Sequence, residues 1–258
     1  MRVAIIGYGK MGKLIRSLAL SEGHDIVLVV DPMATENEVT SKHLEAQSFG
    51  DVDVAIDFSV PSSIIDNMRF YSEMKIPAVI GTTGWYDRMD YVKTEVASEG
   101  CALLWSGNFS LGVHLFFAIV RHAASLCNLF PAYDVMVHEW HHNAKADSPS
   151  GTASMLGEIL LSQLRQKQSV ETSRLDRTRR STEIHVSSSR GGYMPGMHEV
   201  VFDSPVDTIE LIHRARNREG FAYGALRAAE WISDGRKGFF SIDDMLSDMF
   251  PVNANSAG

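Results

Sequence analysis

The first 31 residues constrain the fold more than any other segment, because a buried strand runs directly into a glycine-rich turn. Val3-Ala4-Ile5-Ile6 is apolar without polar alternation, which is typical of a strand buried on both faces of a parallel sheet. Apolar residues recur at helical spacing over residues 13–20, and a second apolar strand at residues 26–30 ends at Asp31. The turn consists of Gly7, Tyr8, Gly9, Lys10, Met11 and Gly12.

The three glycines of this turn have separate physical tasks. Gly7 permits the tight turn, Gly9 lets the backbone approach a pyrophosphate, and Gly12 lets the helix pack close to the strand. The helix N-terminus offers free N–H groups to phosphates, and Asp31, 19 residues after Gly12, is placed to accept hydrogen bonds from an adenosine ribose. A plain glycine turn is the alternative. Because strand, helix and acid are all in place, the pattern favours a dinucleotide site.

Strands and helices continue to alternate up to about residue 105. Apolar strands are expected at residues 52–58, 78–80 and 101–105, whereas residues 32–50 show no clear period and predict a loop or an irregular helix. This alternation predicts a parallel sheet, whose ligands bind at the C-terminal ends of the strands. Two loops at such ends are candidate binding segments, namely Gly81, Thr82 and Thr83, and Ser106, Gly107, Asn108 and Phe109.

The pattern changes after about residue 111. The expected elements are a helix at 111–129, a strand at 133–137, a helix at 152–166 and alternating strands at 182–188, 199–203 and 208–214. A short turn joins the last two strands, which predicts a hairpin. The fold class is therefore α/β, a Rossmann-type parallel-sheet domain plus an α+β domain with a mostly antiparallel sheet. We expect domains at 1–111 and 112–220, with 221–258 returning to the first.

Composition excludes several classes of protein. The formal net charge is 24 − 32 = −8, which argues against a general nucleic-acid binder. Cys101 and Cys127 form neither a C-x-x-C pair nor a metal-binding spacing, so a reducing compartment is expected. The apolar runs at residues 3–6 and 111–120 are too short for a secretory signal or a membrane span. We therefore expect a soluble, cytoplasmic protein.

Ionisable residues are densest between His138 and Thr152. His138-Glu139-Trp140-His141-His142 matches the H-E-x-x-H pattern of zinc peptidases, which requires a helix. The preceding residues predict a strand instead. In a strand, His138 and His142 would lie ~13 Å apart, too far to share one ion. We therefore expect no metal.

The same segment is suited to an anionic substrate. His141, His142 and Lys145 offer positive or donating groups, and residues 148–152 precede an apolar helix whose first N–H groups can bind a carboxylate. A histidine near neutrality can also supply a proton. A solvated polar loop with a helix cap is the alternative.

Over nearly its whole length the chain resembles the dihydrodipicolinate reductase family of bacterial lysine biosynthesis, also called 4-hydroxy-tetrahydrodipicolinate reductase. The most specific likeness is the pattern H-H-x-x-K-x-D-x-P-S-G-T, which spans residues 141–152. Other matching segments are residues 57–59, 81–84, 108–113, 190–198 and 221–225.

The resemblance implies a role for each of these segments. His141 exchanges a proton and Lys145 assists it, while His142, Gly151 and Thr152 hold the carboxylates of a small dicarboxylate substrate. The glycine turn, Asp31, residues 81–83 and residues 106–109 bind NADH or NADPH. Hydride adds to a cyclic imine across a cleft between the domains. The resemblance also implies a homotetramer assembled through the sheet of the second domain.

Two departures from the family pattern bear on the cofactor. The common family turn is one residue longer than residues 7–12, and family members that use both cofactors often carry an arginine where this chain has Pro32. Without that cation, a 2′-phosphate would face the carboxylate of Asp31. We therefore expect a preference for NADH, which Lys10 or Lys42 could soften.

Two other hypotheses stay open at this point. A sugar or aspartate dehydrogenase would share the first domain but not the H-H-x-x-K string. A regulator that binds a dinucleotide without turnover should carry a DNA-binding helix pair with a basic face, and the sequence shows none.

Overall fold

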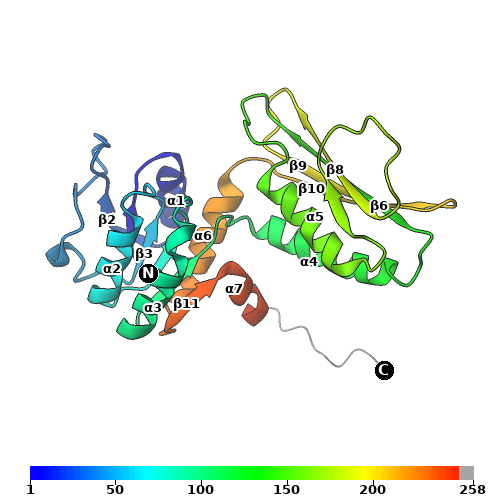
Figure 1. The fold of residues 1–258 in the computed structure, drawn as a ribbon. Helices are drawn as coiled ribbons and strands as arrows, with labels where there is room; N and C mark the ends of the chain where they lie inside the picture. Colours follow the sequence, from blue (N-terminus) through cyan, green and yellow to red (C-terminus); the bar gives the residue numbers. More distant parts are fainter. Residues whose placement is uncertain (250–258) are drawn as a thin grey trace. The chain divides into compact units, whose positions relative to one another are not determined.

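The protein is described from a computed structural model covering residues 1–249, apart from the side chains of residues 97 and 98. Its internal contacts divide the chain into two compact units (Figure 1). The first contains Met1–Ser110 and the chain from Glu219 onward, and the second contains Leu111–Arg218. The end of the expected C-terminal segment, residues 250–258, lies outside the described residues.

The first unit is built on a six-stranded sheet in which every pairing is parallel, which confirms the Rossmann-type prediction. In spatial order its strands are β11 (Gly238–Ser241), β5 (Ala102–Trp105), β4 (Ala78–Ile80), β3 (Val54–Asp57), β1 (Arg2–Ile6) and β2 (Asp25–Val30). Its helices are α1 (Lys10–Ser21), α2 (Ile64–Met74), α3 (Met89–Glu99), α6 (Glu219–Ile232) and α7 (Ile242–Met249).

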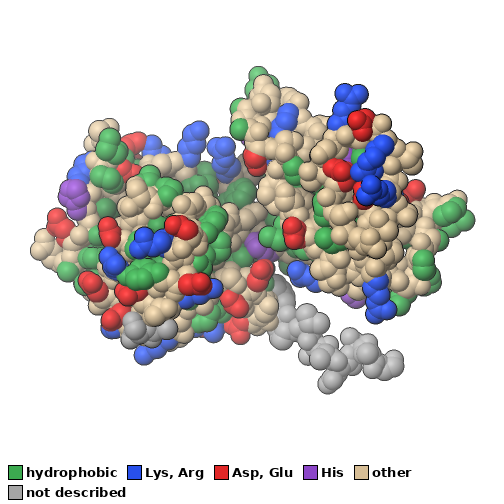
Figure 2. Space-filling view, viewed as in Figure 1, with side chains coloured by type: hydrophobic (Ala, Val, Ile, Leu, Met, Phe, Trp, Pro, Cys, Tyr) green, Lys and Arg blue, Asp and Glu red, His purple; other side chains and the backbone are tan. Residues whose placement is uncertain are grey.

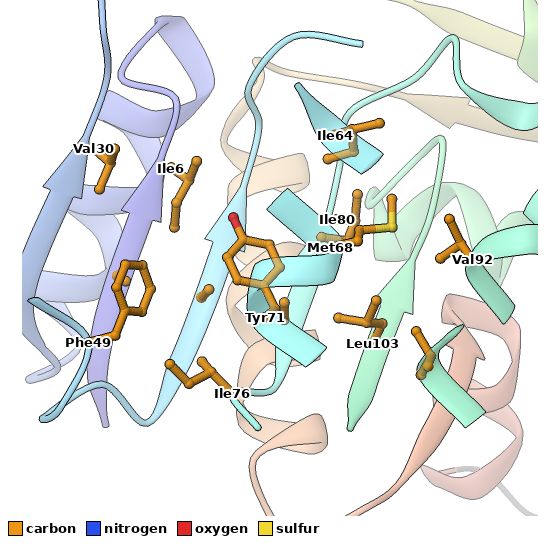
Figure 3. Close-up of a cluster of buried hydrophobic side chains, with 14 of the residues drawn as sticks. Ile6, Val30, Phe49, Ile64, Met68, Tyr71, Ile76, Ile80, Val92 and Leu103 are labelled. Carbon is orange, nitrogen blue, oxygen red and sulfur yellow. The ribbon is translucent and has the colours of Figure 1, made fainter. Parts of the chain in front are cut away.

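Both faces of this sheet are covered, as its apolar strands require. One face packs against α2 and α3. Figure 3 shows a row of buried side chains that runs from Val30 and Ile6 of the strands through Tyr71 and Met68 of α2 to Val92 of α3. Strand alternation turns the neighbouring residues of β1 to the other face, where α1 and α6 pack against each other. Helix α6 also contacts β3, β4 and β5.

The second unit holds a five-stranded sheet with helices α4 (Leu111–Cys127) and α5 (Gly151–Gln163) packed side by side (Figure 1). In spatial order its strands are β10 (Thr208–Arg214), β9 (Met197–Asp203), β6 (Asp134–His141), β8 (Glu183–Arg190) and β7 (Ser169–Glu171). The predicted hairpin is present, with Asp203 opposite Thr208.

This second sheet is mixed. Strands β10, β9 and β6 pair antiparallel as expected, whereas β8 pairs parallel with both β6 and β7. The parallel pairing follows from helix α5, because a helical crossover returns the chain to the same end of the sheet. Phe202 of β9 and Leu156 and Leu160 of α5 lie in the core between the sheet and its helices.

The surface of the described residues carries both acidic and basic side chains (Figure 2), and none of their helices could span a membrane. Acidic and basic side chains are interspersed on the face of the first unit visible in Figure 2. Within residues 1–249, no helix combines the length and hydropathy needed to cross a bilayer.

A wholly buried carboxyl group fixes the loops at one edge of the first sheet. Asp57, the last residue of β3, is 0% exposed and accepts hydrogen bonds from Tyr71 Oη at 2.7 Å and Asn67 Nδ2 at 2.9 Å, both from α2. It also accepts one from the backbone N–H of Ser59 at 2.9 Å. The segment after β3 is therefore tied to α2 through one side chain.

Replacing Tyr71 with Phe should destabilise the protein by about 1–3 kcal/mol, because it leaves a buried acceptor with one donor fewer. Urea unfolding followed by circular dichroism measures this change. Tyr91→Phe is the matched control, since its hydroxyl accepts a hydrogen bond from Arg69 at the surface and its loss should cost at most ~0.5 kcal/mol. Equal losses in the two variants would contradict the argument.

Candidate active site

The glycine turn of the first unit has the geometry that its sequence predicts. Gly7 has φ = 88°, and a Cβ added there would lie 2.5 Å from the carbonyl oxygen of Phe58. A Cβ on Gly12 would lie 2.1 Å from the carbonyl oxygen of Gly7. No larger residue fits at either position. At Gly9, by contrast, an added Cβ would meet nothing within 4 Å.

Helix α1 begins at this turn without a capping side chain. Gly9 is its N-cap residue and supplies no side-chain acceptor, so the first N–H groups of the helix have no cap. Tyr8 is buried, while Lys10 is exposed and Met11 half-buried. The uncapped N–H groups and the open space at Gly9 fit a pyrophosphate.

Asp31 lies at the end of β2, beside the same turn. Its carboxylate accepts hydrogen bonds from the backbone N–H of Tyr8 at 2.7 Å and from those of Met33 and Ala34 at 2.8 Å each. Burial opposes ionisation, but these hydrogen bonds hold the pKa of Asp31 below its ordinary value. The carboxylate is therefore ionised and fixed against the turn.

The loop after β4 is held by aromatic side chains. An added Cβ on Gly81 would lie 2.2 Å from the ring of Phe58, so only glycine fits there. The carbonyl oxygen of Thr82 accepts hydrogen bonds from Nε1 of Trp85 at 2.8 Å and of Trp105 at 3.3 Å. These two hydrogen bonds fix the backbone of this short loop.

The loop after β5 is held in a similar way. Ser106 Oγ donates to the carbonyl oxygen of Asn108 at 2.7 Å and accepts from its N–H at 3.1 Å, while Phe109 is buried. Gly107 in this loop and Thr83 in the preceding one are exposed. Strands β1, β4 and β5 are parallel members of one sheet, so the glycine turn and both loops lie at the same edge.

The histidine segment of the second unit lies on strand β6. Successive side chains point to opposite faces, so Glu139 and His141 are buried while His138 faces the other way and contacts Ser187 and Ser189. His142 follows the strand. The zinc-peptidase interpretation is therefore wrong, because its two histidines are not on a helix.

Glu139 is 0% exposed and has donors on both oxygens. Oε2 contacts His141 Nδ1, while Oε1 accepts from Arg190 Nη2 at 2.8 Å and from the N–H of Ser150 at 3.1 Å. Burial alone would raise the pKa of this carboxyl group, but the hydrogen bonds, led by that of Arg190, hold it below its ordinary value. Glu139 is therefore an ionised group inside the second unit.

His141 lies against Glu139 on one side and a glycine loop on the other. The residue is 8% exposed, and burial lowers the pKa of its imidazole even though the Glu139 carboxylate acts in the opposite direction. An added Cβ on Gly196 would lie 2.8 Å from His141 Nε2. The absence of a Cβ at this position of the loop between β8 and β9 therefore leaves room beside the outer nitrogen of the ring.

A second buried histidine lies beside His141. The ring centroids of His141 and His198 are 5.3 Å apart, and Ser150 Oγ lies 3.2 Å from His198 Nε2. Burial, with the neighbouring His141, lowers the pKa of His198 to about 4, so this ring is neutral at pH 7. Glu139, His141 and His198 each place one ligand atom within 4.8 Å of the others, but a cation there would compete with Arg190 for Glu139.

The remaining predicted residues follow β6 in the chain. His142 is half-buried, and its N–H donates to the carbonyl oxygen of Met194 at 2.9 Å. Lys145 Nζ lies 2.8 Å from Asp147 Oδ1. Gly151 and Thr152 are the first residues of α5.

Ser150 caps helix α5 and so limits the number of backbone N–H groups that the helix N-terminus can donate to a ligand. Its side chain accepts from the N–H of Ala153 at 3.2 Å, which leaves the N–H groups of Gly151 and Thr152 available. The structure thus brings His141 and Ser150, the residue before Gly151 at the start of α5, together around Glu139. No separate role was predicted for Glu139, Ser150 or His198. Glu139 was signalled by the period of two along β6, whereas Ser150 and His198 lie in segments that match the family, residues 141–152 and 190–198.

Family models match both parts of the chain. The dihydrodipicolinate reductase N-terminus model matches residues 1–109, and the C-terminus model matches residues 112–246. The chain belongs to the dihydrodipicolinate reductase family. This reductase is therefore an oxidoreductase, and the two other hypotheses, another dehydrogenase and a regulator without turnover, are not supported.

Individual relatives agree with this assignment. The 4-hydroxy-tetrahydrodipicolinate reductase of Christiangramia forsetii is 36% identical over 97% of this chain and 99% of its own. That of Archaeoglobus fulgidus is 37% identical over 95% of this chain and 100% of its own. The solved dihydrodipicolinate reductase from Paenisporosarcina sp. TG-14, with dipicolinate bound, has the same fold, at a TM-score of 0.75, 22% identity and coverage of 93% of this chain and 97% of its own.

The reductase should lose stability in acid partly through His198. The pKa of this ring is about 4 in the folded state and ~6.5 when unfolded, so the unfolded state binds the proton first and stability falls as the pH drops from 6.5 towards 4. Between pH 7 and pH 5 the wild type should lose roughly 2 kcal/mol more than His198→Gln. Urea unfolding at both pH values measures the difference, and parallel losses in the two proteins would contradict it.

Proposed function

We propose that His141 is the proton-exchanging group of this reductase and that the edge of the first sheet binds its nicotinamide cofactor. The reductase converts 4-hydroxy-tetrahydrodipicolinate to tetrahydrodipicolinate in diaminopimelate and lysine biosynthesis, and its relatives are named for the reduction of this substrate. In the overall reaction the ring gains a hydride and a proton and loses water. The observation that carries the proposal is the buried His141 ring, held at Nδ1 by an ionised carboxylate.

His141 is suited to transfer a proton at Nε2. Nδ1–H donates to Glu139, so Nε2 is the nitrogen that faces away from the carboxylate. Because burial lowers the pKa of the ring, its protonated form is a stronger acid than a free imidazolium. A dianionic substrate beside the ring would favour that protonated form. The nicotinamide, when bound, supplies the hydride.

The substrate carboxylates are proposed to lie between the α5 N-terminus and the cations of the preceding loop. Gly151 and Thr152 offer backbone N–H groups, and Lys145 and His142 offer donors from the chain that leads to the helix. Dipicolinate, the ligand named for the solved relative, is a planar dicarboxylate of the class proposed here. Lys145 would also stabilise charge that develops on the ring during reduction.

The cofactor is proposed to be NADH in preference to NADPH. The uncapped α1 N-terminus, the open space at Gly9 and the ionised Asp31 fit a dinucleotide whose ribose carries free hydroxyl groups. A 2′-phosphate would meet the negative charge of Asp31, and Pro32 supplies no cation. Lys42 donates to the carbonyl oxygen of Ala34, but its charge still acts on Asp31, so it is the cation that would soften this preference.

A homotetramer in the cytoplasm completes the proposal. The face of the second sheet away from α4 and α5 carries apolar side chains, including Met136 at 45% and Ile212 at 37% exposure, which suits contact with other subunits. Cys101 and Cys127 are both buried and free, as expected in a reducing compartment.

Replacing His141 with Gln should lower kcat by roughly a hundredfold or more, the usual effect of removing a general acid, while NADH binding stays within about twofold. Steady-state rates at 340 nm and fluorescence titration with NADH measure the two effects. His138→Gln is the matched control, because it changes the same residue type on the same strand but on the opposite face. A near-normal kcat for His141→Gln would remove this residue from its role.

The kcat/KM with NADH should exceed that with NADPH, because the 2′-phosphate is repelled by Asp31. Pro32→Arg should narrow the ratio by raising kcat/KM for NADPH, with little change for NADH. Both values come from initial rates at 340 nm with saturating substrate. Equal or better use of NADPH by the wild type would refute the preference.

A further inference from the structure

The carboxylate of Glu139 needs an explanation beyond folding. Val135 and Val137 precede it on the same face of β6 and belong to the apolar core. Continuing this pattern with another apolar residue would avoid the cost of burying a charge. The chain instead places an ionised group, 0% exposed, beside the histidine of the proposed active site.

Both oxygens of Glu139 are fixed by neighbouring elements. Oε1 accepts from Arg190 Nη2 of β8 at 2.8 Å and from the N–H of Ser150, the N-cap of α5, at 3.1 Å. Arg190 Nη2 also donates to the carbonyl oxygen of Asp147 at 2.5 Å. Oε2 is thereby directed at His141 Nδ1. The carboxylate cannot rotate away without breaking contacts to two elements.

We propose that Glu139 is a positioning residue that keeps the proton of neutral His141 on Nδ1, leaves Nε2 free to exchange a proton with the substrate, and stabilises the ring once it is protonated. The inference rests on the proposed role of His141 and deepens it. Glu139 does not touch the substrate in this scheme and acts only through His141. Arg190 and the α5 N-terminus hold the carboxylate in the orientation that this requires.

The charges around His141 determine how the loss of Glu139 would change the pH at which the ring is protonated. Glu139 is the one acidic group acting on the ring among those that shift its pKa, whereas Lys145 and Arg190 disfavour its protonation. Neutralising Glu139 leaves the positive groups unopposed. Protonation of His141 then requires a lower pH.

The test compares Glu139→Gln with wild type in the full-length protein. The amide preserves volume but presents no charge, so kcat should fall by roughly tenfold or more, as when the carboxylate behind a catalytic histidine is neutralised. The limb of the kcat/KM profile that reports His141 should move to lower pH by about one unit or more. Binding of NADH and of pyridine-2,6-dicarboxylate should change less than threefold. Glu158→Gln, the same change at an exposed position on α5, should leave all these values unchanged.

A double variant separates positioning from a merely structural role. If Glu139 acts through His141, then Glu139→Gln combined with His141→Gln should be no slower than His141→Gln alone. Multiplied losses would overturn the proposal, as would a wild-type pH profile for Glu139→Gln. Should Glu139→Gln fail to fold, Glu139→Asp keeps the charge but withdraws it from Nδ1. It should still lower kcat severalfold with ligand binding retained, and a wild-type kcat would overturn the proposal.

The same experiments distinguish this inference from the proposed function. A normal kcat for His141→Gln contradicts the proposed role of His141 and the inference with it. A hundredfold loss for His141→Gln together with normal kinetics for Glu139→Gln contradicts only the inference.

Discussion

The burial of carboxyl groups at strand ends is the physical constraint on which both units of this reductase depend. Asp57 ends β3 in the first unit and Glu139 lies near the end of β6 in the second, and each is 0% exposed. A buried carboxyl group without hydrogen-bond donors would cost several kcal/mol, so each must be surrounded by donors from other elements. Those donors come from α2 and the following loop for Asp57, and from β8 and the α5 N-terminus for Glu139. Satisfying one side chain therefore fixes several segments that are distant in sequence.

Much of this architecture was predictable because it follows from local periodicity. The apolar runs of β1 and β2 and the glycine turn between them specify a parallel sheet, and alternation specifies the hairpin of β9 and β10. Strand β11 was missed, since Gly238–Ser241 is a short, half-buried edge strand without an apolar run. The parallel pairing of β6 with β8 was also missed, because strand patterns record which face is buried but not which neighbour lies beside it.

The candidate site was also predictable only where its residues are close together in the chain. The sequence placed His141, His142 and Lys145 near one another because they are close in the chain, and it placed Gly151 and Thr152 at a helix start. It gave no means of finding that Arg190, about fifty residues later, contacts Glu139, or that His198 lies against His141. Those contacts depend on the order of strands in the sheet, where β8 and β9 flank β6 on either side. A period of two along β6 would have revealed only that Glu139 shares a face with His141.

Helix N-termini are the features through which this acidic chain would hold the two anionic ligands proposed for it. The net charge of −8 predicts nothing about either ligand, because both proposed sites rely mainly on local backbone donors. Helix α1 has no capping side chain, so the N–H groups of its first turn are the donors proposed for a pyrophosphate. In helix α5, the N–H of Ala153 donates to the Ser150 cap, and the N–H of Ser150 donates to Glu139. Only the N–H groups of Gly151 and Thr152 are therefore proposed as donors to a ligand. In the proposed site, Lys145 would supply the charge that the shorter set of N–H groups lacks, and His142 would be a further donor.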